Sequence, residues 1–110
     1  MGLFNLITLL RKRERLTRIA RRIAERSLDE VARRVVGLSP EMSLAETRGY
    51  VRARAAVVIY REVNLLLARE RRIHFDDRTR LVRLATEEVV HDIVAQMAFH
   101  RGQRLHVTVA

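Results

Sequence analysis

The residues of this sequence best suited to chemistry are five arginines near its start. They recur at steps of four, three, four and four, and they are Arg11, Arg15, Arg18, Arg22 and Arg26. On a helix these steps place all five guanidinium groups along one face. Guanidinium binds phosphate and carboxylate through planar, paired hydrogen bonds. This arginine stripe therefore predicts contact with a polyanion, with DNA or RNA as the preferred partner.

A solvated helix face is the competing interpretation of the stripe, because acidic residues stand four positions from arginine at three places. The pairs are Glu14 with Arg18, Arg21 with Glu25, and Arg26 with Glu30. Pairs at this spacing form across one helical turn and would neutralise part of the stripe. The sequence alone leaves both interpretations open.

A second set of side chains has the spacing of a metal site. Glu88 and His91 form Glu-x-x-His, and Glu62 lies inside the apolar sector of the preceding helix. Ferritin-like di-iron bundles combine a glutamate on one helix with Glu-x-x-His on another, and a homodimer would complete such a set. However, Glu87 and Asp92 share this face, which is typical of a solvent-exposed acidic surface. An arginine partner would account for the position of Glu62 in the apolar sector. We predict no metal and no cofactor.

The remaining composition favours a non-enzymatic protein. The chain has no cysteine, which excludes thiolate metal sites and cysteine nucleophiles, and it has no glycine-rich phosphate loop.

Its 110 residues fit one domain, 1–110, and carry 22 basic against 13 acidic side chains, a net charge of +9. The excess is concentrated in residues 1–36, so a polyanion would be drawn there. A cytoplasmic location is expected, because the absence of cysteine suits a reducing compartment.

The hydrophobic pattern predicts an all-α fold, a small helical bundle built on a long central helix at about 42–73. Apolar residues cover a sector of roughly 180° on that helix, which indicates contact with two neighbours. A C-terminal helix at about 78–101, ended by Gly102, would pack antiparallel to it. Basic helices would precede them: one at about 5–26 and, after a bend, a short one opened by a Ser27–Glu30 capping box.

The segment Ser27-Leu-Asp-Glu-Val-Ala-Arg-Arg-Val-Val-Gly-Leu-Ser-Pro40 resembles the helix-turn part of the helix-turn-helix of many bacterial regulators. That resemblance implies a following helix that reads DNA. The sequence departs from the pattern at Val35-Val36, where one extra residue lengthens the turn. It also places Glu41 and Glu46 where reading residues would meet DNA.

The C-terminal helix is apolar nearly all round, which predicts an interface with a second copy or with a larger assembly. The residues that we expect there are Val82, Val89, Ile93 and Met97. Residues 103–110 alternate apolar with polar side chains and predict a short extended tail. The N-terminal segment 1–10 is apolar but too short to span a bilayer, and contact of Leu3–Leu10 with a membrane surface is a less favoured expectation.

Two functions follow from these patterns. The preferred one is a non-enzymatic basic module that contacts DNA or RNA through the arginine stripe. The alternative is a structural or accessory subunit that docks into a protein assembly through its apolar C-terminal helix and tail, with a membrane surface as a further possible contact. Strongly salt-dependent binding to unrelated duplexes would favour the first function, whereas a co-purifying protein would favour the second.

Overall fold

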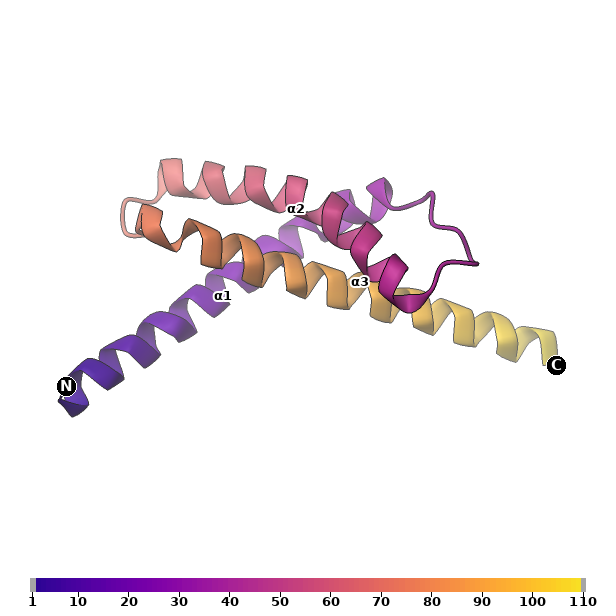
Figure 1. The fold of residues 1–110 in the computed structure, drawn as a ribbon, viewed down its shortest axis with the longest axis horizontal. Coiled ribbons are helices and arrows are strands. Elements are labelled where there is room, and N and C mark those ends of the chain that lie inside the picture. The colour runs from indigo at the N-terminus through magenta and orange to yellow at the C-terminus, as the bar shows by residue number, and fades with distance from the viewer. Residues whose placement is uncertain (1, 110) are drawn as a thin grey trace.

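Three long helices make up the chain in a computed structural model that describes the backbone of residues 2–109 and the side chains of residues 2–98. They are α1, Leu3–Arg34; α2, Leu44–Arg69; and α3, Arg78–Val109, with a short 3-10 turn, η1, at Phe75–Asp77. The helices α2 and α3 form an antiparallel hairpin, and α1 crosses it (Figure 1). The prediction of an all-α bundle is confirmed.

The central helix begins at a capping box. The Ser43 hydroxyl accepts a hydrogen bond from the Glu46 backbone N–H at 3.1 Å, and the Glu46 carboxylate accepts one from the Ser43 N–H at 3.5 Å. Two N-H groups that would lack helical partners are thereby satisfied. The helix ends where Glu70 adopts an extended backbone, with φ −108° and ψ 102°. It is therefore several residues shorter than the predicted range of 42–73.

The predicted bend at Ser27 is wrong, because α1 runs without a break to Arg34. Ser27 is 2% exposed and lies on the buried face that continues from Ala24 to Val31. Packing of that continuous face against the other helices outweighs a local cap, which would require the chain to turn away. Residues 35–43 then separate α1 from α2, whereas a helix-turn-helix has a turn of about three or four residues. The segment therefore lacks that motif's geometry.

The predicted extended tail is also wrong where the structure describes it. Residues 103–109 continue α3, and residue 110 lies outside the described part of the chain. Alternating polarity favours a strand only when a neighbouring strand supplies hydrogen-bond partners. A helix satisfies its own backbone groups, so it needs no such neighbour.

The core forms where the three helices meet, and α3 contacts both of the others. Small side chains such as Ala20, Ala24 and Ala85, each at most 1% exposed, let the helices approach closely. Val89 and Ile93 are 0% and 3% exposed within this single chain. The apolar surround of α3 thus has an explanation that does not need a second copy. Those two residues are not accessible for the predicted interface, whereas Val82 and Met97 remain half-buried.

The start of α1 projects away from the bundle (Figure 1). All residues from 2 to 15 are exposed, and the first ion pair that ties α1 to another element joins Lys12 Nζ to Asp77 Oδ1 at 3.4 Å. Burial begins at Leu16, which is 3% exposed. The first turns of this continuous helix are therefore surrounded by solvent, whereas one face of the remainder packs in the core.

Candidate polyanion-binding site

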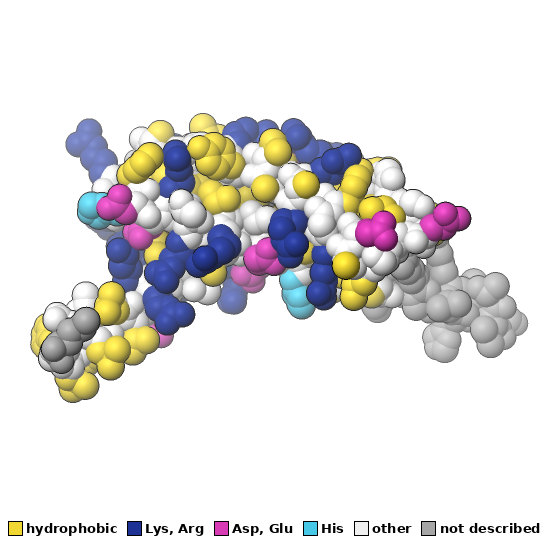
Figure 2. Space-filling view, in the orientation of Figure 1, with side chains coloured by type: hydrophobic (Ala, Val, Ile, Leu, Met, Phe, Trp, Pro, Cys, Tyr) yellow, Lys and Arg dark blue, Asp and Glu magenta, His cyan; other side chains and the backbone are white. Residues whose placement is uncertain are grey.

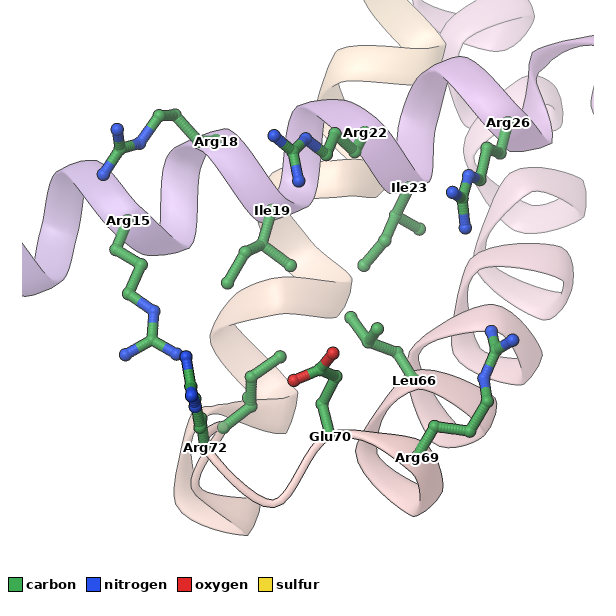
Figure 3. A pocket seen from close by; sticks show the side chains of 11 residues that line it. Arg15, Arg18, Ile19, Arg22, Ile23, Arg26, Leu66, Arg69, Glu70 and Arg72 are labelled. Carbon is green, nitrogen blue, oxygen red and sulfur yellow. The ribbon is translucent and has the colours of Figure 1, made fainter.

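A groove of about 530 Å³ lies between α1 and the C-terminal end of α2 with the loop that follows it. Its walls carry six arginines: Arg15, Arg18, Arg22, Arg26, Arg69 and Arg72. Its floor is aliphatic and is formed by Ile19, Ile23, Leu66 and Ile73. We call this site the arginine groove. Figure 3 shows its arginines coming from both sides.

The fold places these arginines through the residues next to them. On α1 the core residues Leu16, Ala20 and Ile23 fix the orientation of the helix, which directs the basic face toward the end of α2. Arg69 is the last residue of α2, and Arg72 follows in the loop that leads to η1. The sequence alone could not predict that these two arginines lie beside the stripe, because their proximity depends on how α1 crosses the hairpin.

Four of the five predicted stripe residues line the arginine groove, and Arg11 does not. Arg11 lies one turn before Arg15, on the part of α1 that projects from the bundle. Sequence reasoning missed Arg69 and Arg72. The signal that could have found them is the run of basic residues at the end of the central helix, which becomes informative only once its neighbour is known.

The acids that were expected to neutralise the stripe do not pair with it: Glu30 is engaged elsewhere, and neither Glu14 nor Glu25 forms an ion pair within 4 Å among the side chains of residues 2–98. Glu30 accepts a hydrogen bond from Arg61 at 2.6 Å and lies 3.3 Å from Arg34, not from Arg26. Arg21 contacts Glu88 on α3 at 3.3 Å instead of Glu25. Across the side chains of residues 2–98, none of the six groove arginines forms an ion pair within 4 Å.

The groove therefore concentrates positive charge. Of the described side chains that line it, Glu70 is the single acid, so six guanidinium groups and one carboxylate leave a formal charge of +5. Arg15 and Arg72 also line a smaller adjoining cavity of about 240 Å³, beside the ion pair of Lys12 and Asp77, so two guanidinium groups lie in one place there. Figure 3 shows Arg15 reaching toward Arg72 from the opposite wall. A bound anion would relieve this repulsion.

Two acids outside the groove connect helices through arginine. Arg52 on α2 donates to both oxygens of Glu87 on α3, at 2.7 and 3.2 Å, and this contact holds the pKa of Glu87 below its usual value. The hydrogen bond from Arg61 likewise lowers the pKa of Glu30, which links α2 to α1. Each contact favours the charged form of the acid.

The three metal candidates do not converge. Glu62 lies at the edge of the apolar sector, its side chain 30% exposed, with Arg61 3.2 Å away on the same helix. Glu88 pairs with Arg21, and His91 is exposed. Among the side chains that the structure describes, no three histidine, aspartate or glutamate residues come close enough to hold a metal ion.

A scan of family models and searches of curated proteins and solved structures found no match to this chain. Among the helices as described, none combines the length and the apolar character that crossing a bilayer requires. The geometry of the groove is therefore the basis for a functional proposal.

Proposed function

We propose that the protein is a non-enzymatic binding module that holds the phosphate backbone of DNA or RNA in the arginine groove. One observation carries the proposal: six arginines from two helices and a loop line one groove, and none of them has an ion-pair partner among the described side chains. Unpaired guanidinium groups are available for phosphate oxygens, which they bind through paired hydrogen bonds.

The length of the arginine row suits several phosphates. Arg15 and Arg26 are eleven positions apart on α1, which corresponds to about 16 Å at 1.5 Å per residue. One nucleic-acid strand advances about 3.4 Å per nucleotide along the axis, so the row matches about five phosphates. Arg69 and Arg72 face this row from the other wall. A backbone lying in the groove would therefore meet guanidinium groups on both sides.

The groove supplies little that could read bases. Its floor is aliphatic, and no aromatic side chain lines it. Sequence-specific recognition needs groups that match base edges, and single-strand recognition commonly adds aromatic stacking. The proposed binding is consequently independent of sequence and depends on phosphate charge, which makes it sensitive to salt.

The test is binding of fluorescent duplex DNA and single-stranded RNA, each in two unrelated sequences, measured by anisotropy across a salt series. We expect at least one nucleic-acid type to bind, with similar affinity for its two sequences and with weaker binding as salt rises. The double variant Arg22→Glu with Arg69→Glu reverses one charge on each wall. It should weaken that binding at least about tenfold, because two phosphate contacts become repulsive.

A matched control separates the groove from net charge. Arg33→Glu with Arg48→Glu changes the net charge by the same amount, from +9 to +5, at two exposed arginines outside the groove. We expect this variant to lose less than about threefold, since screening weakens distant charges. Failure of both nucleic acids to bind would overturn the proposal, and so would equal losses in the two double variants. Circular dichroism checks that each variant folds.

The alternative of docking through α3 has less support than the groove. Two of its four predicted residues, Val89 and Ile93, are buried inside the chain. A protein that co-purifies in stoichiometric amount, together with an absence of nucleic-acid binding, would favour that alternative.

A further inference from the structure

Large apolar side chains crowd the projecting start of α1. They are Leu3, Phe4, Leu6, Ile7, Leu9 and Leu10, which we call the apolar tip, and they are between 43% and 85% exposed. Figure 2 shows them gathered on the projecting helix, with basic side chains where that helix meets the bundle. Scattered exposed apolar residues are ordinary, but six within eight positions form a patch that indicates an interaction surface.

The patch surrounds more of the helix than docking against one protein surface requires. At 100° per residue, its six side chains cover more than half of the circumference. The Thr8 hydroxyl within it donates to the Phe4 carbonyl at 3.0 Å. This polar group would therefore keep a hydrogen-bond partner in an apolar environment. Asn5 is the remaining polar side chain between Leu3 and Leu10. A medium that contacts a helix from several sides fits this pattern better than a flat protein partner does.

The charges that follow the tip indicate what that medium is. Arg11 and Arg13 are exposed directly after Leu10, and neither has an ion-pair partner among the described side chains. In a parallel pairing of two tips, these arginines would face their copies and repel them. At an anionic bilayer they would lie among phosphate groups, while their long side chains extend along the headgroup layer.

The length of the tip fits insertion into one leaflet. Residues 3–10 of α1 span about 12 Å, whereas the hydrocarbon core of a bilayer is about 30 Å thick. An apolar helix this short, next to basic residues, enters the headgroup and upper acyl region without crossing. The bundle would remain outside, attached through the continuous helix that runs from the tip to the contact between Lys12 and Asp77.

We infer that the apolar tip inserts into the surface of a membrane that contains anionic lipids, with Arg11 and Arg13 contacting the lipid phosphates. This surface is distinct from the arginine groove, since none of the tip residues lines the groove. The inference therefore does not depend on nucleic-acid binding, and each can fail alone.

The test is co-sedimentation with vesicles of phosphatidylcholine, with and without about 30% phosphatidylglycerol. We expect tighter binding to the anionic vesicles. The triple variant Leu3→Gln, Ile7→Gln and Leu10→Gln keeps residues that favour helices but removes apolar surface, and it should bind at least about tenfold more weakly. Arg11→Gln with Arg13→Gln should reduce the preference for anionic lipid.

A matched control makes the same replacement at exposed aliphatic residues of α2. Leu44, Val57 and Leu65 are between 50% and 62% exposed, and the triple change to Gln there should leave vesicle binding within about twofold. Absence of vesicle binding by the unaltered protein would overturn the inference, as would equal losses in the two triple variants. It would also be overturned if sedimentation velocity showed a dimer that the tip variant dissociates while vesicle binding is unchanged.

The two proposals give separable readouts. The tip variant should retain nucleic-acid binding, because the arginine groove is intact. The groove variant Arg22→Glu with Arg69→Glu should retain insertion of the tip, which can be followed as residual binding to anionic vesicles at high salt. Loss of both activities in either variant would indicate one shared surface and would contradict the assignment of the tip.

Discussion

The two ends of α1 both carry large aliphatic side chains, but those side chains differ in burial. Aliphatic side chains occur in residues 3–10, the projecting half, and in residues 16–34, the buried half. Those of the first set are exposed, whereas Leu16, Ile23 and Val31 are at most 7% exposed. The difference lies in what faces each half. The buried half has α2 and α3 beside it, with small residues at the contacts, whereas the projecting half has no neighbour among the described residues. Burial is thus decided by packing partners and not by the apolar content of the helix itself.

The sharpest test of this comparison is the same substitution in each half. Ile23→Ala leaves a cavity at a side chain that is 7% exposed, and we expect a loss of about 2–4 kcal/mol in the free energy of unfolding. Ile7→Ala removes the same atoms where they are 43% exposed, and it should change stability by less than about 0.5 kcal/mol. Urea unfolding followed by circular dichroism measures both. Equal losses would mean that residues 3–10 pack against something in the folded protein.

The comparison also shows what the sequence could predict. Periodicity was sufficient for the all-α class and for a central helix with two neighbours, because both depend on which residues share a helix face. The position of Arg69 and Arg72 beside the stripe was not predictable, since it depends on the angle at which α1 crosses α2. The helix start predicted from the Ser27–Glu30 capping box was wrong for a related reason. Tertiary packing of a continuous α1 outweighed this local signal.

Val89 and Ile93 illustrate the same limit in α3. A helix that is apolar nearly all round can be enclosed by its own chain or shared with another, and its sequence does not distinguish the two cases. The structure encloses these two residues because α1 and α2 cover α3 from two directions. The chain is small, but long helices that cross give each other enough contact.

The starts of α1 and α2 extend the comparison to a smaller effect. The Ser43 side chain caps α2, whereas Gly2 gives α1 no side-chain cap. Ser43→Ala should lower the free energy of unfolding by about 1 kcal/mol, because the Glu46 N–H loses its partner. Gly2→Ser, although it can supply a cap, should leave global stability unchanged within about 0.3 kcal/mol, since fraying of a projecting turn does not unfold the core. Chemical denaturation distinguishes these outcomes, and a large gain from Gly2→Ser would show that the projecting turns are coupled to the bundle.

The smallest expected effect concerns the ion pairs that join the buried parts of the helices. Arg52 and Arg61 hold the pKa values of Glu87 and Glu30 below the usual 4.5. An acid with a lowered pKa in the folded state contributes stability above about pH 4.5 and loses it as the pH falls through the folded value. These pairs are exposed enough for water to screen them, so the loss should be modest. Glu87→Gln should reduce the drop in the urea midpoint between pH 6 and pH 3. Glu14→Gln is the control, because Glu14 lies before the buried half and has no ion-pair partner among the described side chains. This control should leave the drop in the midpoint unchanged. If both variants kept the full pH dependence of the unaltered protein, the contact between Arg52 and Glu87 would contribute nothing to holding α2 on α3.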